Sequence, residues 1–283
     1  MANIIDISNM PDIQKTEPNH NIYIPNVGVE GITLPILVKT IKNEIQSTIA
    51  KINIYVDLDP DKKGIHMSRL ISIMTEAFYS YKSELSFELM KKLCQEVLEK
   101  CEAQNARIEI RFPYFIEKNT PTTELLTISK YDVLFRVETR HMIQFAKHNE
   151  CIKEIMFIPN MEVNCVGTSS CPCSKEISDA GAHNQRSHIK VDCTFDYELG
   201  FIYIENLIDI IETSFSCPIF NILKRPDEKF VTEEAYNNSK FVEDIYRHIM
   251  YECNKVSLIK HVKIHVSNEE SIHQHNAVAC IGF

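Results

Sequence analysis

Three short segments in the second half of the chain combine residues that can bind a metal or move a proton. The first, residues 167–187, contains Cys171, Cys173 and His183. The single residue between the two cysteines differs from the two-residue gap of a zinc knuckle or a redox pair. That residue, Pro172, favours an extended or turn backbone, so we expect only one thiol to face a given site. A polar surface loop with incidental cysteines is the alternative.

The second and third segments add a carboxylate and two imidazoles. Residues 223–233 place charged side chains around Pro226, and because proline makes a continuing helix unfavourable, we expect Glu228 to lie on a loop. The third segment holds His273 and His275, whose spacing puts both on one face of an extended chain. Taken singly, a solvated turn and a pair of surface histidines explain these two segments.

Taken together, the three segments supply sulfur, nitrogen and oxygen donors. The set is Cys171, His183, Glu228 and His273. Thiolate, imidazole and carboxylate are ligands of Zn²⁺ and of other divalent metals such as Mn²⁺ and Fe²⁺. Four protein ligands indicate a closed structural site, whereas a catalytic site requires one ligand to yield to water. Both remain open at this point.

The elements that must position these residues follow from the spacing of apolar residues. Alternation predicts strands. They begin near Ile32 and continue at 52–58, 108–112, 125–138, 152–164, 191–195, 262–266 and 277–283. Apolar residues three and four apart predict helices. These lie at about 67–81, 90–101 (with Ser86 as a plausible cap), 202–215 and 238–254. Both halves read strand, strand, helix, helix, strand, strand, which suggests a duplicated ββααββ unit.

Composition limits the classes of function. Of the 283 residues, 44% are hydrophobic and 24% charged, which excludes wholesale disorder. The net charge of −9 argues against a nucleic-acid partner. We expect no membrane association, because no apolar run reaches the ~18–20 residues that a membrane helix needs. The ten scattered cysteines, without a secretory signal, predict reduced thiols and a cytoplasmic protein.

Several motifs occur together in a specific order. They are VGVEG…LP, GIHMSR, CPCSKEIS, GAHNQRS, LKRPDEKFVTE, KFVED and ESIHQH. Over nearly the whole chain this combination closely resembles GTP cyclohydrolase I of type IB, and CPCSKEIS looks like the bacterial branch. The resemblance implies an α+β tunnelling fold (T-fold) of two ββααββ units, with antiparallel sheets and helices on one face. We expect an irregular lead-in at 1–30, a first unit at 31–140, and a second at 150–283 that carries the site.

The implied reaction converts GTP and water to 7,8-dihydroneopterin triphosphate and formate, the first step of folate-type pterin biosynthesis. Such an enzyme is a hydrolase that acts on C–N bonds of a cyclic amidine. By motif, Cys171 matches a metal-binding and catalytically important cysteine, and His183, Glu228 and His273 match the remaining ligands of one divalent metal (Zn, Mn or Fe). Glu243 matches the carboxylate that anchors the purine. Its alternative is an ion pair with Arg247 one helical turn away.

The implied chemistry suits these residue types. Attack at C8 of guanine needs a water that is nucleophilic near neutral pH, which a bound metal supplies by lowering the water pKa to about 7. His275 can serve the proton transfers that follow. For the triphosphate we assign the nearby cations. These are Lys175, Arg186, Lys224 and Arg225. The resemblance also implies a homotetramer with sites at the subunit interfaces.

Other classes of function stay open. One is a different T-fold enzyme that acts on a purine or pterin. A second is the archaeal type of cyclohydrolase, which uses iron and gives a cyclic-phosphate product. A third is a metal-binding or assembly protein without catalytic activity, which would bind metal tightly and release no formate from GTP.

Overall fold

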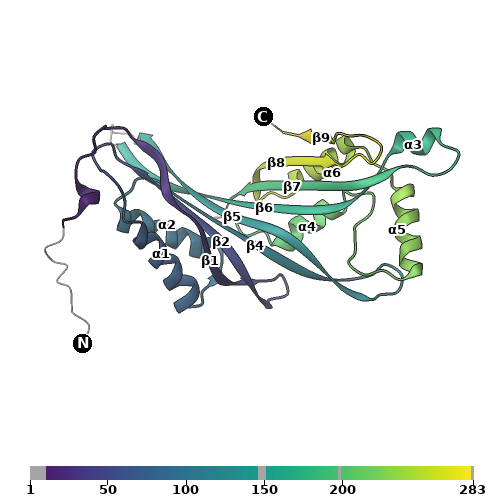
Figure 1. Cartoon of the computed structure of the whole chain (residues 1–283), viewed down its shortest axis with the longest axis horizontal. Helices are drawn as coiled ribbons and strands as arrows, with labels where there is room; N and C mark the ends of the chain where they lie inside the picture. Colours follow the sequence, from purple (N-terminus) through teal and green to yellow (C-terminus); the bar gives the residue numbers. More distant parts are fainter. Residues whose placement is uncertain (1–10, 146–150, 197–198, 282–283) are drawn as a thin grey trace.

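The chain forms one long, twisted sheet with helices packed on it (Figure 1). The computed structural model describes residues 11–145, 151–196 and 199–281, and no side chains between 142 and 154. Within these residues nine strands follow the order β3-β1-β2-β4-β5-β6-β7-β8-β9. Neighbours are antiparallel, apart from the short parallel pairing of β1 with β3. The strands are β1 (Ile24–Lys39), β2 (Ile45–Leu58), β3 (Glu84–Leu85), β4 (Ala106–Asn119), β5 (Leu126–Phe145), β6 (Cys151–Ser170), β7 (Asn184–Phe195), β8 (Ile259–Asn268) and β9 (Ala277–Cys280).

The helices occupy the connections between the strands, except for η2, which precedes β1. They are the 3₁₀-helix η2 (Ile13–Lys15), α1 (Met67–Met74), the π-helix η3 (Thr75–Ser80), α2 (Phe87–Cys101), α3 (Pro172–Ile177), α4 (Ile204–Glu212), α5 (Arg225–Asn237) and α6 (Val242–Lys255). Ser86 caps α2, as predicted, because its hydroxyl accepts a hydrogen bond from the Leu89 N–H at 3.1 Å. Among the helices of the described residues, none combines the length and apolar character that crossing a membrane requires.

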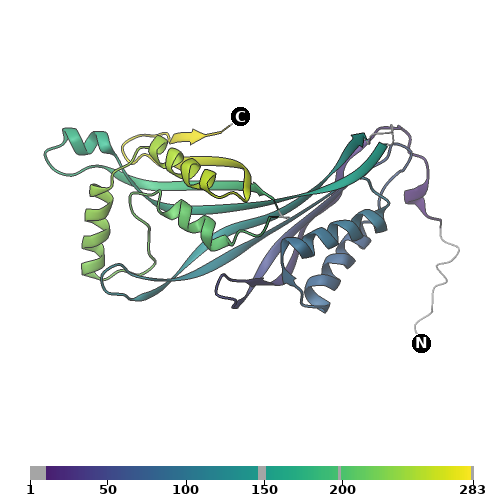
Figure 2. The same ribbon diagram turned by 180° about the vertical axis from the view of Figure 1, so that it is seen from behind.

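A single core runs the length of the sheet on the face covered by α1, α2, α4 and α6 (Figure 2). The alternation predicted from the sequence explains it, since every second residue of a strand points to that face. At the middle of the sheet, Val133 of β5 lies opposite Val163 of β6, and Phe135 opposite Met161, all of them buried. The halves of the chain therefore share one hydrophobic core.

The predicted fold class, an α+β tunnelling fold of two ββααββ units with antiparallel sheets, is wrong. The helices do lie on one face, but there is one sheet, because β5 and β6 pair from Asp132 with Asn164 to Phe145 with Cys151. The order of elements also departs from ββααββ. Strand β3 lies between the helices of the first half, and α3 and α5 are inserted in the second. The architecture is a mostly antiparallel nine-stranded sheet, and the division at 31–140 and 150–283 stays a prediction.

Strand β1 begins at Ile24, earlier than the expected Ile32 and inside the segment predicted to be irregular. Pro25 disfavours a strand in the interior of a sheet, where its missing N–H would break the ladder. Here β1 is bordered on its outer side only by β3, which pairs with Leu37 and Val38. Pro25 therefore lies where β1 is the edge of the sheet, and in the described residues no neighbouring strand on that side requires a backbone N–H from it.

Candidate active site

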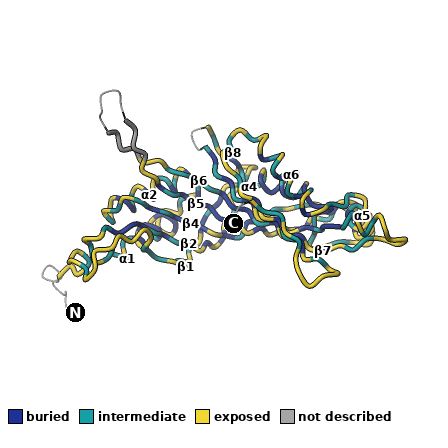
Figure 3. The backbone as a smooth tube through the Cα atoms, turned by 90° about the horizontal axis from the view of Figure 1, so that it is seen from above, coloured by how far each residue is buried: buried dark blue, intermediate teal, exposed yellow. Residues whose placement is uncertain are grey.

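The three segments singled out in the sequence gather at the end of the sheet remote from the N-terminus. Figure 1 shows α3, α5 and the connection from β8 to β9 at this end. Helix α3 follows β6 directly, and α5 stands across the tip of the sheet. Figure 3 shows that much of this end is exposed. The sheet thus brings together segments that are about a hundred residues apart in the chain.

Glu228 lies on helix α5, so the prediction of a loop is wrong. Pro226 occupies the first turn of this helix, where a missing N–H costs no hydrogen bond. The neighbouring Asp227 is buried and accepts hydrogen bonds from the backbone N–H groups of Lys224 (3.0 Å) and Thr123 (2.9 Å). These bonds hold the start of α5 against the turn between β4 and β5. Glu228 itself is exposed.

Cys171 is hydrogen-bonded to His183, the residue directly before β7. Its backbone N–H donates to the His183 carbonyl at 3.1 Å, and its own carbonyl accepts from the Lys175 N–H at 3.1 Å. Cys171 has an extended backbone and forms the N-cap of α3, which Pro172 begins. The two thiols differ in exposure, since Cys171 is half-buried and Cys173 is exposed.

The His183 imidazole lies in a small polar cluster with only 14% of its side chain exposed. Its Nδ1 is 3.0 Å from Oε1 of Gln185 and 3.8 Å from Oε2 of Glu270. Glu270 belongs to the β8–β9 connection, and its backbone carbonyl accepts the N–H of His273 at 3.1 Å. The rings of His273 and His275 are exposed and stacked, with centroids 5.0 Å apart. Glu270 therefore links the predicted ligand His183 to the histidine segment, a contact that its spacing in the sequence did not reveal.

The four predicted ligands are only partly brought together. Cys171 and His183 are neighbours, and Glu270 connects His183 to the segment of His273, but the exposed Glu228 has no hydrogen bond to any of these side chains in the described parts of the chain. Within those parts no three His, Cys, Asp or Glu side chains form a group that could hold a metal ion. The donor types fit a borderline divalent ion, whereas their arrangement in the isolated chain does not surround one.

The four cations assigned to the triphosphate have different surroundings. Lys175 is engaged with α5, because its Nζ donates to the carbonyls of Tyr236 (2.7 Å) and Asn237 (3.2 Å). Arg186, on β7, lines a cavity of about 420 Å³ between the strands and α5. Lys224 and Arg225 are exposed at the start of α5. Two of the four cations therefore lie at the start of α5, where the helix dipole also favours an anion.

Glu243 is exposed in the first turn of α6. The alternative prediction, an ion pair with Arg247, is wrong, since the Arg247 guanidinium pairs with Asp244 at 3.1 Å. The Glu243 carboxylate is thus available to a ligand at the positive end of a helix.

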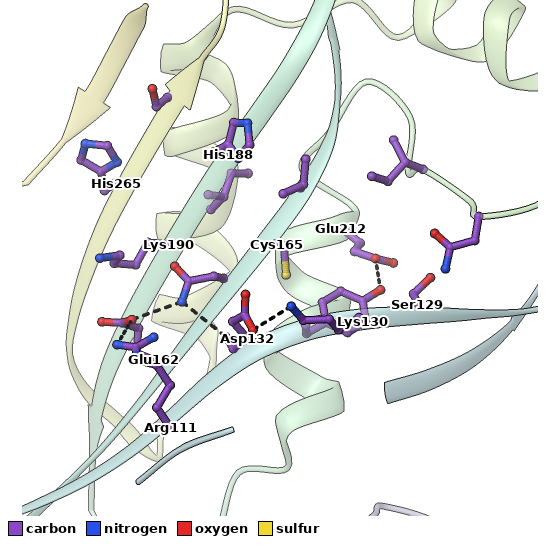
Figure 4. Close-up of a pocket in the computed structure, with 17 residues that line it drawn as sticks. Arg111, Ser129, Lys130, Asp132, Glu162, Cys165, His188, Lys190, Glu212 and His265 are labelled. Atoms are coloured by element: carbon purple, nitrogen blue, oxygen red, sulfur yellow. Dashed lines mark hydrogen bonds and ion pairs between the residues drawn. The ribbon is translucent and has the colours of Figure 1, made fainter. Parts of the chain in front are cut away.

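A cavity of about 820 Å³ was not predicted and contains none of the expected site residues (Figure 4). It is lined by charged side chains of both signs from β4 to β8. Arg111 pairs with Glu162 at 3.1 Å, and Lys130 with Asp132 at 3.2 Å, while Lys190 lines the same hollow. The polar positions of the alternating strands could have indicated such a surface, but not that the strands would line a hollow.

Comparison with known proteins identifies the family. Residues 10–279 match the family model described as type I GTP cyclohydrolase folE2. The GTP cyclohydrolase FolE2 of Geobacter sulfurreducens is 40% identical over 96% of this chain and 97% of its own length. That of Magnetococcus marinus is 40% identical over 96% and 95%.

Solved structures show the fold alone. A mutant urate oxidase of Bacillus sp. TB-90 superposes with a TM-score of 0.53 at 9% identity, covering 91% of this chain and 99% of that one. A uricase from Bacillus fastidious superposes with a TM-score of 0.53 at 10% identity, covering 93% of this chain and 93% of that one. The long sheet is therefore shared with these structures, while the match along nearly the full sequence is with the cyclohydrolases. This chain belongs to the type I GTP cyclohydrolase FolE2 family.

Proposed function

We propose that this protein is a GTP cyclohydrolase I of the bacterial type IB branch. It converts GTP and water to 7,8-dihydroneopterin triphosphate and formate, the entry to folate-type pterin synthesis. The observation that carries this proposal is 40% identity over 96% of the chain to relatives named GTP cyclohydrolase FolE2.

Glu243 would hold the guanine base. Its carboxylate is exposed in the first turn of α6 and is not used by Arg247, which pairs with Asp244. A carboxylate accepts two hydrogen bonds side by side, so it can bind the N1–H and the exocyclic amine of guanine together. Recognition of the base would therefore come from one side chain that is left available for it.

The triphosphate would be held by Arg186, Lys224 and Arg225. The last two stand at the start of α5, and Arg186 lines the cavity beside the same helix. Lys175 would contribute less, because its ammonium already binds the end of α5. All three phosphates remain on the product, so these cations bind the substrate without taking part in bond cleavage.

Cys171, His183, Glu228 and His273 would hold one divalent ion, with zinc, manganese and iron as candidates. Their donor types support this, as does the contact between Cys171 and His183. When bound, such an ion makes water nucleophilic near neutral pH. His275, stacked on His273, is placed to pass protons during ring opening and formate release. In a homotetramer with sites at the subunit interfaces, a second chain would supply the contacts to metal and substrate that one chain lacks.

The test is an anaerobic GTP assay on metal-stripped protein, with Zn²⁺, Mn²⁺ or Fe²⁺ added back singly. Formate and the pterin product are quantified for the wild type, Cys171→Ala and the control Cys173→Ala, which removes the neighbouring exposed thiol. We expect metal-dependent formate that is lost in Cys171→Ala and kept in Cys173→Ala. A linear triphosphate on the product supports type IB, and a cyclic phosphate would place the enzyme in the archaeal type. Folded protein that releases no formate with any metal would contradict the proposal and direct attention to other purine and pterin substrates.

A further inference from the structure

Lys240, in the short connection between α5 and α6, binds three backbone carbonyls at once. Its Nζ donates to Thr213 at 3.2 Å and to Ser214 and Phe215 at 3.0 Å. These carbonyls follow the end of α4, where the backbone has no partners within the helix. Burial lowers the pKa of Lys240. The side chain therefore anchors the α5–α6 connection to the end of α4.

The backbone of Lys240 is bound to the end of β6. Its N–H donates to the carbonyl of Ser170 at 3.0 Å, and its carbonyl accepts from the hydroxyl of Ser169 at 3.2 Å. Ser169 is fully buried and also receives the side-chain amide of Asn268 at 3.2 Å. Because Ser170 directly precedes Cys171, these bonds hold in place the end of β6 from which the chain continues into Cys171.

On its other side, Lys240 is joined to the start of α6. The next residue, Phe241, is the N-cap of this helix, and its N–H donates to the Asp244 carboxylate at 3.1 Å. Glu243 lies in the same turn. A single residue is thus attached both to the strand end that presents Cys171 and to the helix start that presents Glu243.

We propose that Lys240 is a positioning residue that holds the thiol of Cys171 at a defined place relative to the carboxylate of Glu243. The functional roles of those two side chains rest on the proposed function, whereas the anchoring rests on the hydrogen bonds above. An ammonium suits the position because it has three donors on one compact atom, and the flat guanidinium of arginine presents its donors differently.

Lys118 offers a matched control for removing a lysine that binds α4. Its Nζ pairs with Glu212, the last residue of that helix, and its side chain is 17% exposed. In the described residues Lys118 binds Glu212 and lies over the ring of Tyr131, and it makes no hydrogen bond or ion pair with Ser170 or with the start of α6. Lys118→Met and Lys240→Met therefore each remove a lysine contact to α4. Only the second frees the α5–α6 connection from the end of α4, and the backbone bonds of residue 240 to Ser169 and Ser170 remain, because they do not depend on its side chain.

The first measurement is independent of turnover. Cys171 and the half-exposed Cys101 of the remote helix α2 are alkylated in the folded protein, and the labelling rates are compared by peptide mass spectrometry. We expect Lys240→Met to change the ratio of Cys171 to Cys101 labelling several-fold and Lys118→Met to leave it near the wild-type value. Lys240→Arg, which keeps the charge, is measured in parallel and is expected to fall between them; it also serves as the folded variant if the methionine variant does not fold.

The second measurement compares GTP with ITP, which lacks the exocyclic amine that Glu243 would bind. Because a site built to bind a donor discriminates against the analogue that lacks it, the wild type should prefer GTP, and Lys240→Met should lower the GTP-to-ITP ratio of kcat/KM by about tenfold. A lower amount of folded protein reduces both activities equally and leaves this ratio unchanged, as expected for Lys118→Met.

The outcomes are distinguishable. Wild-type protein that releases no formate refutes the proposed function, and the labelling ratio still decides whether Lys240 positions Cys171. A labelling ratio in the Lys240 variants equal to that of Lys118→Met overturns the inference. Altered labelling with an unchanged GTP-to-ITP ratio overturns the link to Glu243.

Discussion

Thr123, in the turn between β4 and β5, binds the Asp227 carboxylate of α5 twice, through its backbone N–H at 2.9 Å and its hydroxyl at 2.6 Å. The two residues are about a hundred positions apart in the chain. Asp227 also accepts the N–H groups of Thr122 at 2.9 Å and of Lys224 at 3.0 Å. Burial alone would raise the pKa of this carboxyl, but the hydrogen bonds from Thr123, Lys224 and Thr122 hold it well below the ordinary value. The helix that carries Glu228 is therefore attached to the sheet through one charged group.

Asp227→Asn should lower the melting temperature by several degrees, because an amide accepts fewer of these bonds and leaves buried donors unsatisfied. The pKa of Asp227 is lower in the folded than in the unfolded protein. Its contribution to stability is therefore complete above the unfolded pKa of about 3.9 and is lost as the pH falls through the folded value. Melting curves from pH 7 downward should show the difference between wild type and variant shrinking only below about pH 4. The exposed Asp61, changed to Asn, is the control and should have little effect at any pH. A constant difference across the whole range would contradict the assignment.

Gly167→Ala should destabilise the protein by about 1–3 kcal/mol, the usual cost of overpacking a core. A Cβ at Gly167 would lie 2.2 Å from the ring of Phe215, which is fully buried and unable to move away freely. Urea denaturation measures the change in the free energy of unfolding. Gly64→Ala is the matched control, because its Cβ would meet only Gln14 at 3.8 Å, an ordinary contact. Equal effects of the two substitutions would show that the close approach at Gly167 is absent in solution.

The cysteines should differ in their reaction with iodoacetamide at pH 8. Burial raises the pKa of Cys94 to about 12, and burial together with Glu234 raises that of Cys217 to about 11, so both remain protonated thiols at this pH. Cys173 is exposed on α3 and should be labelled first. Peptide mass spectrometry of the folded protein at short times measures the order. Early labelling of Cys94 or Cys217, without loss of structure, would contradict it.

Glu243→Gln should reduce kcat/KM for GTP by about 10- to 100-fold, the range expected when hydrogen bonds to a charged group are weakened. This follows from the proposed function and from the carboxylate being left available by the Arg247–Asp244 pair. Steady-state kinetics of formate release measures it. Arg247→Ala is the control, since it removes an exposed ion pair in the same helix and should change the kinetics little. If both variants behave alike, Glu243 does not bind the base.

The amino-acid sequence by itself determined the elements whose cause is local. The alternation of Ile52, Ile54 and Val56 predicted part of β2, and the Ser86 hydroxyl predicted the start of α2. These patterns suffice because the pleat of a strand and the cap of a helix depend on neighbours in the chain. The motifs also pointed to the cyclohydrolase family before any geometry was known, and the match to residues 10–279 confirmed it.

What only the tertiary structure decided depends on contacts between remote residues. Pro226 suggested a loop, but Asp227 is held by Thr122 and Thr123, and these bonds help to keep α5 in place. Two ββααββ units were expected from the order of elements, but the pairing of β5 with β6 joins all strands into one sheet. In the sequence Lys240 is only the first residue of the KFVED motif, whereas in the fold its ammonium and backbone connect α4, β6 and the start of α6. Local patterns carry no information about which remote donor meets which acceptor, since that is settled when the sheet and its helices close around one core.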